Sequence, residues 1–259
     1  MRDSNEDLEV VVFRTLGAMP RPRFRSRRPK RAEPGATPPE PVPIARVTVI
    51  SADGFDDEDA AKRWLERCRK NEDAREQEAN AALRVLNAAL HAQRISAGNP
   101  YVHDVSRRQA HCVRLGYGSG EEVVDGRWHD ACVLPDPASR GGRRQMLAPQ
   151  EQVAAILSGR SPAHVSEDLV LRARLDLDQG RARAAAFQLR VAADAFEAEL
   201  REAESGGDEL GRLRDMKGKL AALAEAALHS ELDASQASEL HEALEQLERA
   251  IRRRRHKGL

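Results

Sequence analysis

The C-terminal half of the chain repeats its apolar residues at the spacing of amphipathic helices. Leucine and isoleucine recur three, four and seven positions apart, which places them on one face of a helix with 3.6 residues per turn. Gly180 and the pair Gly206–Gly207 interrupt this pattern and mark helix ends. We therefore predict helices over 149–157, 166–179, 181–204, 208–229 and 235–255.

The last two of these helices carry the clearest apolar stripe. Its members are Leu210, Leu213, Leu220, Leu223, Leu228, Leu240, Leu244, Leu247 and Ile251. Side chains at these spacings on two successive helices pack between one another as in a coiled coil. The pattern predicts a helical hairpin closed by leucines.

The stretch 169–196 resembles a single tetratricopeptide-like helical hairpin. Gly180 stands at the turn. The second helix then places Ala185, Leu189 and Ala192 where that family alternates small, large and small residues. The first helix lacks the family's aromatic and glycine positions, and no second copy occurs at the repeat period, although stacking needs about three copies. We therefore predict a helical hairpin and assign the chain to no family.

Short apolar runs near the N-terminus predict two strands. Residues 8–16 include three consecutive valines and a phenylalanine, which favour strands, and the alternating run 45–51 is the expected partner. Between them, residues 20–43 join a basic run to the proline-rich sequence AEPGATPPEPVP. Because proline removes a backbone donor and restricts the preceding residue, we expect this insert to be disordered.

A long helical pattern follows over 57–96, with acidic residues in its first turn, where they complement the helix dipole. Its middle is polar on all sides, so the helix either bridges solvent there or breaks. A Gly-Asn-Pro sequence ends it. The segment 101–134 then predicts a third strand within 110–118, a turn with a short helical piece, and a fourth strand within 130–135.

These patterns together predict an α+β, mostly helical protein. A small α+β domain over 1–135 would contain a sheet of two to four strands and the one long helix. A loop over 136–148 would connect it to an all-helical region over 149–259, built of helical hairpins and ending in basic residues.

Composition limits the possible environments of the chain. The 42 basic and 42 acidic residues leave no net charge. The acidic N-terminus does not start like a signal peptide, and no apolar run approaches the roughly 20 residues of a membrane span. Three cysteines without a framework spacing fit reduced thiols. We expect a cytoplasmic protein without disulfides or a transmembrane helix.

Positive charge is concentrated in two segments, 20–31 and 252–257, neither of which contains an acidic residue. Cations on such segments neutralise phosphates, and an aromatic side chain among them can stack on a base. The other explanation is a solvated loop for the first segment and dipole compensation at a helix end for the second. The candidate nucleic-acid-binding residues are Arg21, Arg23, Phe24, Arg25, Arg27, Arg28, Lys30, Arg31, Arg252, Arg253, Arg254 and Arg255.

Aromatic and histidine side chains gather within 101–132. The candidate pocket residues are Tyr101, His103, His111, Tyr117, Trp128 and His129. A zinc site would need three or four converging ligands, such as His129 and Cys132 with one residue of the His111–Cys112 pair. The spacing matches no zinc signature, and adjacent residues on a strand point to opposite faces. A Cys–His nucleophile pair is the catalytic alternative. We predict a small mixed core here, with no metal, no cofactor and no assigned catalytic residue.

Three functional hypotheses remain, and they rest on different residues. The leading one is a non-catalytic intracellular interaction or scaffold protein, whose leucine-striped helices bind a partner protein or a second copy of the chain. The first alternative is nucleic-acid binding through 20–31 and 252–257. The second is an enzyme or metal site within 101–132.

Overall fold

The computed structural model describes residues 9–17, 44–135, 152–202 and 207–256. The insert predicted over 20–43 and the loop predicted over 136–148 lie outside these residues. Residue contacts divide the chain into two compact units, Met1–Arg140 and Gly141–Leu259. The fold is α+β and mostly helical, as the sequence predicts.

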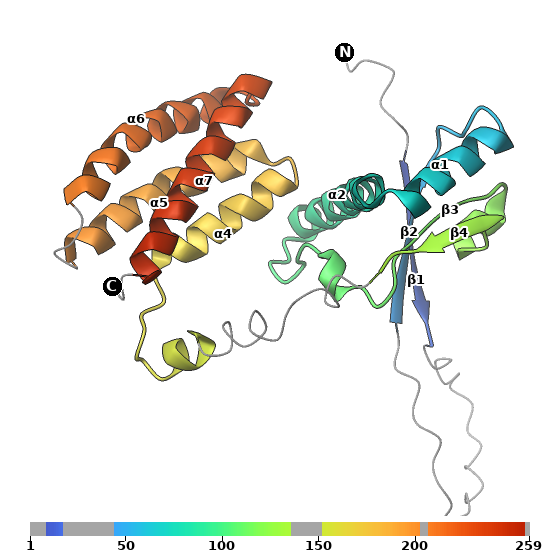
Figure 1. Ribbon diagram of the computed structural model, residues 1–259, viewed down its shortest axis with the longest axis horizontal. Coiled ribbons are helices and arrows are strands. Elements are labelled where there is room, and N and C mark those ends of the chain that lie inside the picture. Colours follow the sequence, from blue (N-terminus) through green and yellow to red (C-terminus); the bar gives the residue numbers. More distant parts are fainter. Residues whose placement is uncertain (1–8, 18–43, 136–151, 203–206, 257–259) are drawn as a thin grey trace, which may run out of the picture. The chain divides into compact units, whose positions relative to one another are not determined.

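Four strands in the N-terminal unit form two separate antiparallel sheets of two strands each. Strand β1 (Glu9–Leu16) pairs with β2 (Ile44–Ser51), and β3 (Arg114–Tyr117) pairs with β4 (Asp130–Val133). Each strand lies where the sequence predicts one, and the predicted pairing of the first two is confirmed (Figure 1). The strands are divided between two sheets, whereas a single sheet was expected.

The helical pattern over 57–96 forms two helices, so of the two outcomes expected for its polar middle the break is the one that occurs. The two helices are α1 (Glu58–Lys70) and α2 (Glu72–Ala97). Asn71 separates them in an extended conformation, with φ −112° and ψ 118°. Its side chain accepts a hydrogen bond from the backbone N–H of Ala74 at 3.1 Å and so caps the second helix. The break falls in the polar middle of the pattern, where no apolar stripe holds one continuous helix against a core.

Each small sheet of the N-terminal unit packs against one helix. Helix α1 contacts β3 and β4, and helix α2 contacts β1 and β2. Leu65 and Cys68 of α1 are fully buried. On α2, the buried side chain of Asn87 accepts a hydrogen bond from the Val105 N–H at 2.8 Å and donates one to the Val105 carbonyl at 3.0 Å. This pair of bonds fixes the segment that precedes β3 to the helix.

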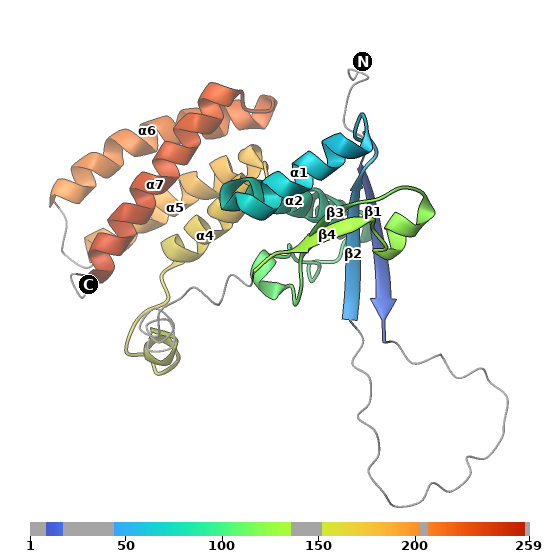
Figure 2. The same ribbon diagram turned by 45° about the vertical axis from the view of Figure 1, so that its right-hand side comes forward.

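Four helices of the C-terminal unit lie within two residues of their predicted bounds. They are α4 (Val165–Asp178), α5 (Ala182–Glu202), α6 (Gly207–His229) and α7 (Ala234–His256). A further short helical segment occupies 152–157. Helices α4 and α5 form a hairpin that turns at Gly180, whose φ of 73° favours glycine. Helix α7 contacts α4, α5 and α6, and Figures 1 and 2 show it lying across the α4–α5 hairpin.

Most of the leucine stripe of the last two helices is buried in the core of this unit, whereas Leu228 at the end of α6 is exposed. It meets Val170, Ala173 and Leu177 of α4 and a row of small and large apolar residues along α5. The stripe residues with the least exposure are Leu213, Leu220, Leu223, Leu240, Leu244 and Leu247. The side chains that predict the helices therefore also hold them together within one chain.

Candidate functional site: a cationic groove between α6 and α7

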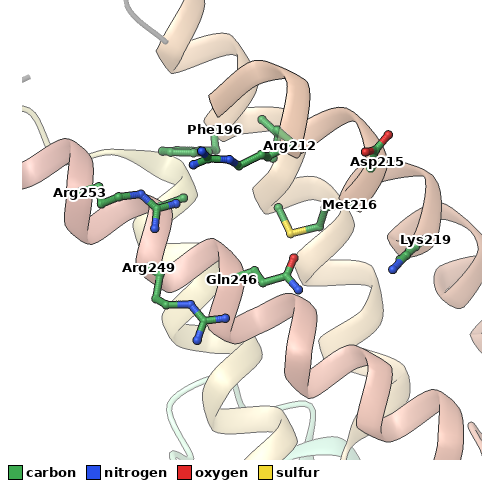
Figure 3. Close-up of a pocket in the computed structure, with 10 residues that line it drawn as sticks. Phe196, Arg212, Asp215, Met216, Lys219, Gln246, Arg249 and Arg253 are labelled. Atoms are coloured by element: carbon green, nitrogen blue, oxygen red, sulfur yellow. The ribbon is translucent and has the colours of Figure 1, made fainter. Parts of the chain in front are cut away.

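A groove of about 380 Å³ opens between α6 and α7. Its floor is apolar, because Leu213 and Met216 from α6, Ala250 from α7 and Phe196 from α5 line it and are buried. Figure 3 shows Met216 and Gln246 extending into the space between the two helices. These helices pack against each other much less closely than α4 packs against α5, which leaves room for the groove.

The rim of the groove is cationic. Arg212 and Lys219 stand on α6, seven residues apart, and Arg249 and Arg253 stand on α7, four residues apart. Residues at these spacings project from the same side of a helix. The only acidic residue among those that line the groove is Asp215, so the lining carries a net charge of three positive units.

One cation of the groove, Arg249, takes part in an exposed ion pair. Arg249 pairs with Glu245 one turn earlier at 3.6 Å, and both side chains are more than half exposed. Exposed pairs of this kind contribute about 0.5 kcal/mol and exchange readily with water. Lys217, on the side of α6 that faces α5, differs because it pairs with Asp194 at 2.6 Å and also with Glu197. Lys217 therefore joins α6 to α5.

The four consecutive arginines predicted to bind nucleic acid point in four directions. Successive residues of an α-helix are rotated by about 100°, so a run of four cannot form one face. Arg252 pairs with Glu248 at 3.4 Å, and Arg253 lines the groove. Arg254 is buried, and Arg255 pairs with Glu167 at 2.5 Å.

Arg254 forms a buried ionic cluster that joins the C-terminal end of α7 to α4 and α5. Its guanidinium lies 2.5 Å from Glu199 and 3.1 Å from Glu167, with 3% of the arginine side chain exposed. The Phe196 ring lies below it, with its centroid 5.0 Å from the guanidinium carbon. The Ser166 hydroxyl donates a hydrogen bond to Glu199 at 2.6 Å. This arginine is therefore a structural residue in the described part of the chain.

The carboxylates of this ionic cluster are held in their charged form. Burial raises the pKa of Glu199, but hydrogen bonds from Arg254 and Ser166 more than offset it, so that the pKa is lowered overall. Burial likewise raises the pKa of Glu167. Hydrogen bonds and charge interactions with Arg255 and Arg254 outweigh burial, so the pKa of Glu167 is lowered overall. Both acids are thus ionised at neutral pH and balance Arg254.

The structure brings together part of the predicted pocket in the N-terminal unit. The Tyr117 and His129 rings meet edge to face with centroids 6.3 Å apart, and the Ser119 hydroxyl lies 3.3 Å from Nε2 of His129. Trp128 packs over Gly116, where an added Cβ would come within 2.4 Å of the indole ring. The side chains of Tyr101, His103 and His111 are exposed in the segment before β3.

The described ranges contain neither a metal-ligand group nor a membrane-spanning helix. There, no group of three or more His, Cys, Asp and Glu side chains is placed to hold a metal ion. No helix in the described part of the chain has the length and apolar surface needed to cross a bilayer. The predicted basic residues Arg21 to Arg31 lie outside the described residues, so their role stays a prediction.

Sequence reasoning found Arg253 but missed Arg212, Lys219 and Arg249. The signal was present, because each α6 cation directly precedes a stripe leucine, and Arg249 and Arg253 share one side of α7. The sequence does not show that these cations line one groove. Their grouping depends on the distance between α6 and α7, and the helical periodicity of each helix does not specify that distance.

Comparison with protein-family models, curated proteins and solved structures finds no match for this chain. The functional argument therefore rests on the groove and its surroundings. A groove with an apolar floor and charged walls binds ligands that combine both characters.

Proposed function

We propose that this protein is a non-catalytic interaction protein, and that its helical unit holds a segment of a partner protein in the groove between α6 and α7. The observation that carries the proposal is the combination of a buried apolar floor with an exposed polar rim in one open groove. Grooves of this kind bind peptide segments by taking up apolar anchors while the rim fixes register and direction.

The partner-binding surface differs from the one the leucine pattern suggests. Most of the stripe leucines are buried within the helical unit and only Leu228 among them is exposed, so an intermolecular coiled coil along the stripe would have to open that unit first. The groove, in contrast, is accessible without any unfolding. We therefore keep the scaffold hypothesis and propose the groove, in place of the leucine stripe, as the partner-binding surface.

The alternatives have less support from the described residues. For nucleic acid, Arg254 is buried in an ionic cluster and Arg255 pairs with Glu167, which leaves the C-terminal run without a common face. For an enzyme, the segment 101–132 brings Tyr117, Ser119 and His129 together, but no group of metal-ligating side chains forms among the described residues. Both hypotheses stay predictions.

Selection of peptides on the full chain tests the proposal. A library of random 16-residue peptides is selected against the wild-type protein, and the Kd of each enriched peptide is measured for two variants. Gln246→Phe fills the groove from its exposed rim, and Ser238→Phe adds the same ring to an exposed position of α7 that does not line the groove.

We expect enriched peptides to bind Gln246→Phe at least tenfold more weakly than wild type and to bind Ser238→Phe within twofold of wild type. A library that yields no binder, or binders equally tolerant of both variants, would contradict the proposed function.

A further inference from the structure

We propose that Cys68 and Cys132 form a redox site, at which a hydroperoxide joins their thiols in a reversible disulfide that links α1 to β4. Both thiols are free in this structure. The site lies within the N-terminal unit and is independent of the groove, so it goes beyond the proposed function. Three features support it: the packing of α1 on the β3–β4 sheet, the direction of the Cys132 side chain, and the different exposure of the two thiols.

Helix α1 packs on the β3–β4 sheet at the level of the two cysteines. It contacts both strands, and Figure 1 shows it beside them. The Arg69 guanidinium donates hydrogen bonds to the Asp130 carboxylate at 2.6 Å and to the Ala131 carbonyl at 3.1 Å. Cys68 is the neighbour of Arg69 on the helix, and Cys132 is the neighbour of Ala131 on the strand. These bonds therefore bring the two cysteines to the same part of the interface.

The side chain of Cys132 lies on the face of the sheet that α1 covers. Side chains alternate between the two faces of a strand, so Asp130 and Cys132 share a face, and Asp130 bonds to Arg69 of α1. Cys68 is fully buried on the helix. Burial is the largest cause that raises the pKa of the Cys68 thiol, and the charges of Glu78 and Cys132 raise it further. The two sulfur atoms are thus close enough for the charge of one to act on the other.

The third cysteine, Cys112, is placed too far along the sheet to pair with Cys132. The register of β3 and β4 pairs Cys132 with Leu115. Cys112 precedes Leu115 by three residues, which is about 10 Å along an extended chain. A disulfide needs Cα atoms at most about 7 Å apart. Cys112 is also exposed, so it provides an internal control for non-specific oxidation.

The difference in exposure sets the order of the reaction. Cys132 is partly exposed and meets the oxidant first, whereas Cys68 is buried and stays a protonated thiol. The Cys132 thiolate attacks hydrogen peroxide and breaks its O–O bond, which gives a sulfenic acid and hydroxide. The hydroxide takes up the proton that the Cys132 thiol has lost and becomes water.

The Cys68 sulfur then attacks the Cys132 sulfur and forms the S–S bond. The hydroxyl of the sulfenic acid leaves with the Cys68 proton as a second water. In total, two thiols give two electrons and two protons to one peroxide. The products are one disulfide and two waters, and an added thiol reductant reverses the bond.

The disulfide would cross-link a unit that has a small apolar core. It closes the chain over 68–132, which restricts the unfolded chain and so favours the folded one. We expect amide hydrogen exchange of 58–70 to slow at least tenfold when the full chain is oxidised, and to return to its initial rate after treatment with dithiothreitol.

Peptide mapping of the full chain treated with hydrogen peroxide tests the pairing. After the remaining free thiols are blocked and the chain is unfolded, cleavage after glutamate places Cys68 in 67–72, Cys112 in 79–121 and Cys132 in 123–151. We expect most chains to yield 67–72 linked to 123–151, and the linked peptide to disappear with dithiothreitol. Linkage through 79–121, or a sulfinic acid on Cys132 beside an unmodified Cys68, would overturn the inference.

Two single-thiol variants make the test specific. Cys112→Ser should keep the linked peptide and the slowed exchange. Cys132→Ser should lose both, and Cys68 should stay a free thiol at the peroxide dose that links the wild type. Circular dichroism checks the fold of each variant, and if Cys132→Ser does not fold, the peptide maps of wild type and Cys112→Ser decide the pairing.

Discussion

The two units of this protein are stabilised in different ways. The helical unit has one continuous apolar core that extends from Val170 on α4 to Ile251 on α7. The described part of the N-terminal unit has few buried apolar side chains, namely Ala61, Leu65, Cys68, Ala79, Leu86 and Leu134. A large core tolerates local changes by sharing them among many contacts, whereas a small one depends on individual interactions.

Specific polar contacts supplement the small core of the N-terminal unit. Asn87 makes two hydrogen bonds with the Val105 backbone. The Arg69 guanidinium donates to Asp130 at 2.6 Å and so joins α1 to β4, while the Trp64 indole donates to Glu78 at 3.0 Å between α1 and α2. Apolar helix packing therefore stabilises the C-terminal unit, and side-chain hydrogen bonds contribute more of the stabilisation in the N-terminal unit.

Replacing Arg254 with methionine should produce the largest effect, and it tests whether the helical unit depends on its core alone. Glu199 would lose the guanidinium that pairs with it while its side chain stays largely buried, and Glu167 would keep only its pair with Arg255. The expected cost is about 3–5 kcal/mol in the free energy of unfolding. Hydrogen exchange of peptides from α4 to α7, together with urea denaturation, measures this loss.

Arg253→Met makes the same chemical change at the neighbouring exposed position and should cost less than about 0.5 kcal/mol. If the two variants were equally stable, the ionic cluster would contribute nothing and the apolar core would account for the whole unit.

Asn87→Ala should produce the next largest effect and tests the dependence of the N-terminal unit on polar contacts. Both backbone groups of Val105 would lose their partner, for an expected loss of about 2–3 kcal/mol. Hydrogen exchange across 101–117 reports the change. Asn80→Ala, at an exposed position of the same helix, should leave the exchange rates as they are.

Acid should destabilise the helical unit through the same ionic cluster. The pKa values of Glu167 and Glu199 are lowered in the folded chain from an ordinary value of 4.5, so their stabilising effect is complete above about pH 4.5. It is lost as the pH falls through the lower folded pKa values. Stability measured between neutral pH and pH 3 should therefore decrease, and the difference between wild type and Arg254→Met should narrow below about pH 4. A constant difference would argue against the ion pairs as its cause.

Asn71→Ala should produce the smallest effect and tests how firmly the break between α1 and α2 is set. Loss of the cap on α2 should cost about 1 kcal/mol. Asn71→Asp keeps an acceptor for the Ala74 N–H and should remain within about 0.5 kcal/mol of wild type. Thermal denaturation with hydrogen exchange of 58–97 measures both variants.

The sequence predicts the helical unit well because two signals agree there. Leucines at helical spacing define the buried faces, and glycines such as Gly180 mark the ends, so the bounds of α4 to α7 fall within two residues of expectation. The pairing of β1 with β2 is likewise predicted from two short valine-rich runs. These features are local and repeat along the chain.

The features that sequence did not predict depend on tertiary structure. The capping role of Asn71 is one, because an asparagine within a polar helical stretch reads as an ordinary surface residue. The burial of Arg254 is another, since a run of four arginines gives no indication of which one meets Glu199. The groove depends on the separation of α6 from α7, so its cations are adjacent in space but not in sequence.

The distribution of aromatic residues has a practical consequence. Both tryptophans and both tyrosines, including Trp64 and Trp128 described above, belong to the N-terminal unit, whereas the helical unit has only phenylalanines. Intrinsic fluorescence and near-ultraviolet absorption therefore observe one unit, while far-ultraviolet circular dichroism is weighted toward the helices of the other. The wild-type chain thus reports on its two halves through separate optical signals, and a peptide without tryptophan or tyrosine would leave the intrinsic fluorescence signal to the protein alone.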